Sequence, residues 1–458
     1  MNPLLIKNGR IITPEKTFTG DILTIGKKIV AVGQNLHAPE SRTQIVDASG
    51  LLVMPGGIDP HVHFELPVGN GIVSSDDFYS GSRAALAGGT TTIIDFVTPE
   101  PGQSLPDALA ERQKLAEKSA CDYGLHMSVT EWRPDIEKEL EICAEKGATS
   151  VKVYMAYKET IGLEEDELFK VMLAANKLGL VVLVHCEDGD RISETRDRFL
   201  AEEKKTPRYH PLSRPAACES DAIQRALHMA EEAGSQLYIV HISTAEGVAA
   251  LHQARERGVS AHGETCPHYL LLDEEKYNLP PKEAVEYVMS PPLRNKRHQQ
   301  PLWDALADGT LQSVGTDHCP FTLQQKFAGI ADFTKIPNGV AGVEHRLSLL
   351  YTYGVKKNKI SLPQFVNLVS TSPAKLFGLY PRKGTLLPGS DADIVLWDGN
   401  ADETIFAKSM RQHCDHTIYE GWKISGKPSL VISGGRIRYD NGEFFVEPGD
   451  GAFLYRTR

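Results

Sequence analysis

The sequence lacks a long apolar run and a secretory leader. No hydrophobic stretch approaches the roughly 18 residues needed to span a bilayer. The segment from Met1 to Lys7 lacks the basic-then-apolar order of a signal peptide. These absences argue against a membrane partner, and they predict a protein of the cytoplasm.

A surplus of basic charge is also missing. The chain has 49 lysines and arginines against 60 aspartates and glutamates, which gives a formal net charge of −11. Nucleic-acid backbones and anionic membranes attract basic surfaces, so we expect no nucleic-acid partner. A small, roughly neutral substrate is easier to accommodate.

Paired cysteines are absent as well. The chain has seven cysteines with no Cys-x-x-Cys pair, which argues against a disulfide framework and a thiolate zinc site. We expect them to be reduced and mostly structural.

The composition that remains is typical of a folded protein. The chain has 458 residues, of which 41% are hydrophobic and 24% charged. A TIM barrel with insertions takes roughly 200 to over 400 residues as one unit. The length therefore predicts one large domain and a smaller one.

The two ends of the chain resemble each other. Residues 5–12 and 431–438 both read as a strand, a glycine turn and a second strand, which is the pattern of a β-hairpin. We predict a small β-sandwich domain built from both termini, residues 1–53 and 380–458.

Residues 54–379 alternate strand-like runs with amphipathic helical stretches, the pattern of a parallel α/β fold. An open doubly wound sheet would share this pattern, but no Gly-x-Gly-x-x-Gly follows the first strand. We therefore predict a TIM (β/α)8 barrel. Its helices include 105–118, 136–146, 164–178 and 219–233, and its strands are 57–63, 90–96, 123–129, 150–155, 181–185, 237–241, 259–263 and 311–317.

Catalytic groups of a TIM barrel lie at the C-terminal ends of its strands. His61 and His63 are two residues apart on a strand, so both imidazoles leave the same face and can bind one ion. Alone, the pair could be ordinary histidines at a loop mouth. Two further histidines end apolar strands, however, so the set predicts a metal centre: His61, His63, Lys152, His185, His241 and Asp317.

Lys152 is the unusual member of this set. Strand alternation places it inside the barrel, where an ammonium beside two dications would be disfavoured. One alternative is an ion pair between Lys152 and Asp317, and Asp317 could otherwise form a barrel salt bridge. Reaction with carbon dioxide would instead give a carbamate, N6-carboxylysine, whose two oxygens can bridge two metals.

Several distinctive motifs occur along the chain: GIDPHVH (57–63), GGTTTIID (88–95), Lys152 followed by MAYK (155–158), GETCP (263–267), SPPLR (290–294), GTD (315–317), IPNG (336–339) and GSDAD (389–393). Together they resemble the dihydropyrimidinase and hydantoinase family from end to end.

The resemblance implies a two-metal centre, usually of zinc, although imidazole and carboxylate ligands suit several divalent ions. It assigns His61, His63 and Asp317 to one ion and His185 and His241 to the other, with carboxylated Lys152 and a hydroxide bridging both. It also implies that Tyr157, Ser290 and Asn338 bind the cyclic amide of the substrate.

The activity implied is ring opening of 5,6-dihydropyrimidines or 5-substituted hydantoins to N-carbamoyl amino acids. The bridging hydroxide would attack the carbonyl, Tyr157 would polarise it, and Asp317 would pass a proton to the leaving nitrogen. The family also implies a homotetramer or homodimer. The tail at 449–454, with its aromatic, is a candidate for that interface.

Three alternatives share this superfamily. Dihydroorotases usually carry an arginine two residues after the histidine pair, where this chain has Glu65. Allantoinases resemble the chain less around 155–158, and the non-catalytic collapsin-response-mediator proteins have lost metal ligands that are intact here. Side-chain preference and enantioselectivity depend on loops such as 64–77, 97–102 and 157–162, and stay open.

Overall fold

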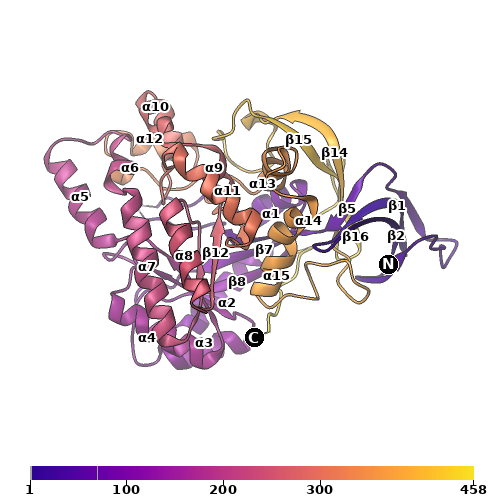
Figure 1. The fold of residues 1–458 in the computed structure, drawn as a ribbon, viewed down its shortest axis with the longest axis horizontal. Helices are drawn as coiled ribbons and strands as arrows, with labels where there is room; N and C mark the ends of the chain where they lie inside the picture. The colour runs from indigo at the N-terminus through magenta and orange to yellow at the C-terminus, as the bar shows by residue number, and fades with distance from the viewer. Residues whose placement is uncertain (1–2, 70, 458) are drawn as a thin grey trace.

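The computed structural model describes residues 3–69 and 71–457. Met1, Asn2, Asn70 and Arg458 lie outside the described residues, and Asn70 belongs to the expected specificity loop 64–77. The chain forms a helix-covered barrel with a smaller sheet domain beside it (Figure 1).

The barrel is a parallel sheet in which each strand pairs with the next along the chain. A parallel bridge between Val62 and His318 links the first strand to the segment after the last. The predicted TIM barrel is thus confirmed. Its strands are β6 (Gly57–Val62), β7 (Thr90–Val97), β8 (Asp122–Ser128), β9 (Ser150–Tyr154), β10 (Val181–His185), β11 (Gln236–Ile239), β12 (Ala261–Thr265) and β13 (Ser313–Val314).

The helices that cover the barrel begin and end at local signals. In α4, Glu164 and Glu167 form a reciprocal cap at the start, and Gly179 adopts a left-handed conformation at the end. All four helices named from the sequence are present: α2 (Leu105–Ala116), α3 (Ile136–Glu145), α4 (Glu165–Leu178) and α7 (Ala216–Ala233).

The last barrel strand is much shorter than the expected 311–317, and β12 lies two residues later than expected. Side-chain hydrogen bonds take the place of the backbone pairing that a longer strand would have made. Arg346 Nη1 donates to the carbonyl of Val314 at 2.9 Å, and the amide of Thr316 donates to Asp59 Oδ1 at 3.2 Å. The backbone beyond Val314 is therefore fixed without being extended strand.

The smaller domain is a nine-stranded sheet to which both ends of the chain contribute. Ile11, Ile22 and Ile394 belong to one buried core of this sheet, so the predicted small β domain built from both termini is confirmed. In Figure 1 the indigo and yellow strands lie side by side, because β5 joins β1 to β14. Its strands are β1 (Leu4–Ile12), β2 (Thr17–Ile25), β3 (Lys28–Gly33), β4 (Gln44–Asp47), β5 (Leu52–Pro55), β14 (Ile394–Thr404), β15 (Lys423–Ser433), β16 (Arg436–Asp440) and β17 (Glu443–Phe444).

The two expected terminal hairpins differ in outcome. Residues 431–438 turn at Gly434 and Gly435 between β15 and β16, as predicted. The prediction for residues 5–12 is wrong, because β1 continues through them as one strand with a bulge. At the bulge Asn8 has φ 63° and its amide donates to Asp21 Oδ1, so the kink is absorbed without reversing the chain.

The C-terminal tail returns to the barrel rather than standing free. Leu454 donates to the carbonyl of Tyr123 at 2.7 Å, and the ring of Phe453 lies 5.7 Å from that of Tyr123. Arg456 is fully buried and donates to Ser150 Oγ. Phe453 is thus half-buried against its own chain, and the part of the tail in a subunit interface stays a prediction.

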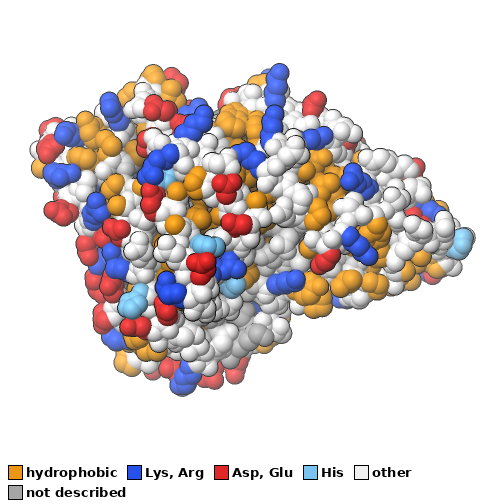
Figure 2. Space-filling view, viewed as in Figure 1, with side chains coloured by type: hydrophobic (Ala, Val, Ile, Leu, Met, Phe, Trp, Pro, Cys, Tyr) orange, Lys and Arg blue, Asp and Glu red, His pale blue; other side chains and the backbone are white. Residues whose placement is uncertain are grey.

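On the face seen in Figure 2, acidic and basic side chains are interspersed among hydrophobic ones. None of the described helices is both long enough and apolar enough to cross a membrane.

Candidate metal centre

The six residues predicted as ligands all lie at or near the C-terminal ends of barrel strands. His61 lies in β6, Lys152 in β9, and His185 ends β10. The other three lie shortly after their strands: His63 directly follows β6, and His241 and Asp317 lie a few residues beyond the ends of β11 and β13.

One half of the centre contains His61, His63 and Asp317. Asp317 Oδ1 lies 3.1 Å from His61 Nε2 and 3.0 Å from His63 Nε2. One ligand atom from each residue lies within 4.8 Å of the other two, so the three can hold a single ion. Burial would raise the pKa of the Asp317 carboxyl, but His61 and His63 hold it well below its usual value.

The other half contains His185 and His241. His185 Nδ1 lies 2.9 Å from His241 Nε2, and the His241 ring stacks on that of His61 at 5.5 Å between centroids. Burial lowers the pKa of both imidazoles. Neutral imidazole is the form that coordinates metal ions.

Lys152 interacts electrostatically with both halves, with Asp317 in one and with His185 and His241 in the other. It is 1% exposed, and its Nζ is 5.2 Å from the centroids of both Phe96 and Tyr154. Among the described residues no carboxylate lies within 4.0 Å of this Nζ, so the alternative ion pair with Asp317 does not form. Burial lowers the pKa of Lys152 to about 8.

These features fit a pair of divalent ions. The donors are imidazoles and a carboxylate, which suit zinc and several other divalent metals. His63 Nδ1 is buried without a partner among the described residues, and two imidazole nitrogens face each other at the His185–His241 contact. The neutral form of a lysine with a lowered pKa is the nucleophile that carbamate formation requires.

The backbone at the centre is held in an unusual conformation. Tyr157, His241 and Asp317 have φ of 62°, 41° and 50°. Left-handed backbone at residues other than glycine costs on the order of 1–3 kcal/mol each, and it is often found at functional sites. In this protein the left-handed conformation occurs at three candidate site residues, each shortly after the end of a barrel strand.

The three predicted substrate-binding residues lie close to this centre or on its loops. The ring centroid of Tyr157 lies 5.3 Å from that of His185. Burial raises the pKa of Tyr157, so its hydroxyl stays protonated and can donate a hydrogen bond. Ser290 Oγ and Asn338 Oδ1 are buried, and neither has a hydrogen-bond partner within the described part of the chain.

Sequence reasoning missed two carboxylates that orient the histidines. Glu264 Oε1 lies 2.7 Å from His61 Nδ1, and Glu187 Oε2 lies 2.9 Å from His185 Nε2. Such partners fix the orientation and tautomer of a ligating histidine. Their signals were available, because Glu187 follows His185 by two residues and Glu264 lies in the GETCP motif.

The glutamates also shift the pKa of the histidines. Burial alone would lower the pKa of His61, but the carboxylates of Glu264 and Asp317 raise it to about 9. Glu187 additionally accepts from Arg214, whose guanidinium lies 5.2 Å from the centroid of the Tyr157 ring.

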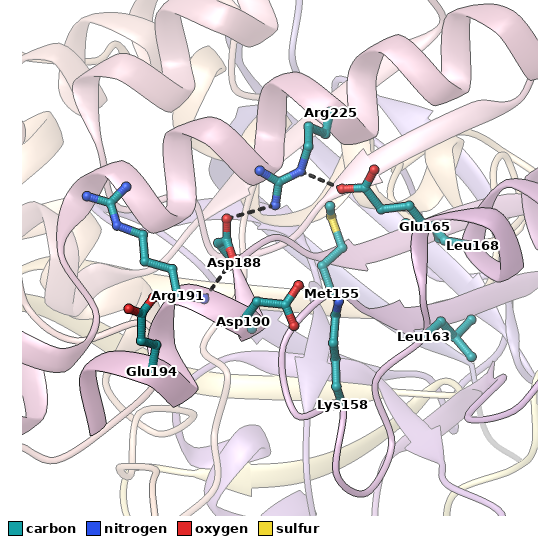
Figure 3. Close-up of a pocket in the computed structure, with 11 residues that line it drawn as sticks. Met155, Lys158, Leu163, Glu165, Leu168, Asp188, Asp190, Arg191, Glu194 and Arg225 are labelled. Carbon is teal, nitrogen blue, oxygen red and sulfur yellow. Dashed lines mark hydrogen bonds and ion pairs between the residues drawn. The ribbon is translucent and has the colours of Figure 1, made fainter. Parts of the chain in front are cut away.

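A cavity of about 560 Å³ lies beside the loop that carries Tyr157. Figure 3 shows its charged groups paired with one another: Arg225 contacts Asp188 at 3.2 Å and Glu165 at 2.7 Å. Lys158 pairs with Asp190 at 2.7 Å. None of the six candidate ligands lines this cavity, so it is separate from the candidate metal centre.

Comparisons with known proteins agree with this geometry. The model of the amidohydrolase family matches residues 52–438. The chain is 44% identical to a D-hydantoinase of Geobacillus stearothermophilus, over 99% of this chain and 96% of that one. It is 40% identical to a dihydropyrimidinase of Rattus norvegicus, over 99% and 88% of the two chains. The crystal structure of the dihydropyrimidinase from Brevibacillus agri superposes with a TM-score of 0.97 at 42% identity, over 99% of both chains.

The chain belongs to the amidohydrolase family, whose model covers most of its length, and this membership defines it as a hydrolase. Within that family it is a cyclic amidohydrolase of the hydantoinase and dihydropyrimidinase group.

Proposed function

We propose that the chain opens the ring of 5,6-dihydropyrimidines or 5-substituted hydantoins and releases N-carbamoyl amino acids. The observation that carries this proposal is the convergence of four buried imidazoles and Asp317 around Lys152, a buried amine with no carboxylate partner among the described residues. The relatives named D-hydantoinase and dihydropyrimidinase support the substrate class.

The proposed ligands divide between two divalent ions, for which zinc is our first choice. His61, His63 and Asp317 hold one ion, and His185 and His241 hold the other. Lys152, once carboxylated, would be the ligand that the two ions share. When bound, two such ions supply a hydroxide nucleophile at neutral pH and polarise the carbonyl under attack.

The remaining steps use groups of this chain. The Tyr157 hydroxyl donates a hydrogen bond to the carbonyl oxygen as negative charge develops on it. Asp317 accepts the proton of the attacking hydroxide and passes it to the ring nitrogen as the C–N bond breaks. Ser290 and Asn338 hold the N–H and C=O groups of the ring, mainly through their backbone.

We also propose a cytoplasmic homotetramer, or else a homodimer. Support comes from the family resemblance, and light scattering of the purified protein tests it. A monomer at working concentration would contradict it.

The decisive experiment is ring opening by the metal-loaded protein with a chelator-treated control. The substrates are dihydrouracil, hydantoin, racemic 5-phenylhydantoin, allantoin and dihydroorotate. We expect chelator-sensitive turnover of the first three, and the chirality of the products gives the enantioselectivity. If fully metal-loaded protein turned over none of those three substrates, the proposed function would be overturned.

A further inference from the structure

Lys326 is a buried cation that the proposed chemistry does not use. It lies in the short helix α12 (Leu323–Ala328) and is 0% exposed. Among the described residues no carboxylate lies within 4.0 Å of its Nζ. Burying an ammonium without a counter-ion is costly unless its protons are all hydrogen-bonded.

Three backbone carbonyls supply those hydrogen bonds. Lys326 Nζ donates to Val288 O at 2.8 Å, to Pro337 O at 2.9 Å and to Gly339 O at 2.7 Å. An ammonium has three donors, so the three acceptors satisfy it completely. Burial lowers its pKa to about 7, and the nearby Cys414, Cys319 and Glu286 do not offset this effect fully.

The three carbonyls belong to the two loops that carry the proposed substrate-binding residues. Val288 lies two residues before Ser290, and Pro337 and Gly339 flank Asn338 on both sides. The loops also contact each other directly, because the amide of Gly339 donates to Val288 O at 3.1 Å. The ammonium therefore joins both loops through the residues that adjoin Ser290 and Asn338.

The helix that carries Lys326 is itself held in place. Thr322 and Gln325 form a reciprocal cap at its start, and Gln325 Nε2 donates to Val73 O. The amide of Leu323 donates to Asp415 Oδ1 in a segment of the smaller domain. The lysine consequently extends from a fixed support toward the two loops.

We propose that Lys326 is a positioning residue that sets the spacing between the backbones of Ser290 and Asn338, and thereby the fit of the substrate's cyclic amide. This inference rests on the proposed function for its kinetic consequence. Its structural part, the joining of the two loops by one ammonium, does not depend on that function.

The first test compares Lys326→Met with wild type. Methionine keeps a similar length and removes the three donors. Because Ser290 and Asn338 contact the ring before and during reaction, their displacement weakens binding of substrate and transition state together. We expect KM to rise about tenfold to a hundredfold, with a much smaller change in kcat and unchanged metal content.

Two controls separate positioning from general damage. Lys335→Met changes a lysine that is 71% exposed and pairs with Asp332, and it should leave KM unchanged. Lys326→Ala should regain low KM with n-propylammonium but not with tetramethylammonium, which has the charge without N–H donors. A wild-type KM in folded Lys326→Met, or equal rescue by both cations, would overturn the inference.

Hydrogen exchange distinguishes failure of this inference from failure of the proposed function. If the wild-type protein opens no ring, the proposed function fails, while the loops can still be examined. Amides in 286–290 and 336–340 should exchange faster in Lys326→Met than in Lys335→Met. Unchanged protection in both segments would show that the ammonium does not hold the loops.

Discussion

Lys152 is the residue on which the proposed two-metal chemistry depends most. We expect Lys152→Ala to abolish turnover together with tight metal binding, because the bridging carbamate cannot form. Metal analysis and ring-opening assays measure both losses, and intact mass shows whether wild type carries one added CO₂. Lys170→Ala, at an exposed lysine paired with Asp166, should retain both properties. Full activity in Lys152→Ala would contradict the proposed role of the carbamate.

Tyr157 provides a second test at the level of one hydroxyl. Removing one donor from an oxyanion-stabilising site costs about 10²–10³ in kcat, and we expect a loss of that size in Tyr157→Phe with little change in KM. Steady-state kinetics measure it. Tyr353→Phe removes a hydroxyl that contacts Lys423 O and should be silent. A kcat near wild type would remove Tyr157 from the mechanism.

The lowered pKa of Glu187 predicts how the stability of the fold depends on pH. Burial alone would raise its pKa, but Arg214 and His185 lower it from an ordinary 4.5 to about 2. A carboxylate with a lowered folded-state pKa stabilises the fold above 4.5, and that contribution is lost as pH falls toward 2. Its size is on the order of 3 kcal/mol.

Denaturant unfolding of metal-free protein between pH 5 and about 2.5 tests this prediction. Glu187→Gln should be less stable than wild type at neutral pH, and the difference should shrink as pH falls. Glu203→Gln, at an exposed position, serves as the control. A constant difference across the window would contradict the lowered pKa.

The candidate ligands could be predicted from sequence because strand periodicity and the barrel rule both concern single residues. The roles of Glu264, Arg214 and Lys326 could not. Their importance comes from partners distant in sequence, such as the 203 residues that separate His61 from Glu264. Burial without a counter-ion, as at Lys326, is visible only after folding.

Closure of the barrel between β6 and β13 depends on side chains as well as backbone. Arg346 is fully buried, donates to the carbonyls of Ile58 and Val314, and lies 3.8 Å from Asp59. Arg346→Met leaves the Asp59 carboxylate buried without its ion partner. Loss of one member of a buried ion pair costs about 3–5 kcal/mol.

Chemical denaturation measures the loss expected for Arg346→Met. The matched control is Arg257→Met, whose half-exposed partner Glu231 lies at 3.0 Å and whose loss should cost less than about 1 kcal/mol. Equal unfolding midpoints for the two variants would show that Arg346 is dispensable for closure.

Sequence patterns predicted the existence of the elements better than their ends. The four named helices and the eight strands are present because their apolar periodicity is strong. β13 and β1 differ from expectation where side chains such as Asp59, Arg346 and Asp21 replace or interrupt backbone pairing. The hydropathy pattern does not show where a side chain will take the place of backbone hydrogen bonds.

At the scale of the whole molecule, the division into 1–53, 54–379 and 380–458 stays a prediction, and the tail shows where it is incomplete. Residues after Gly449 pack on the barrel although they follow the smaller domain. We expect a chain ending at Pro448 to unfold at a lower temperature than the full chain. Arg456→Met should reproduce part of that loss, since Ser150 and Leu125 O lose a donor. Calorimetry measures both, and an unchanged midpoint in both would contradict a structural role.

The pairing of β5 with β14 has a consequence for synthesis on the ribosome. The two strands end and begin at residues 55 and 394, and translation proceeds at roughly 5–20 residues per second. The apolar strand β5 is therefore synthesised on the order of 20 to 70 seconds before β14, its second neighbour in the sheet. Throughout that interval it presents an open edge that other nascent chains can join. Slower growth at low temperature and chaperone supply should accordingly decide how much of this protein a cell recovers in folded form.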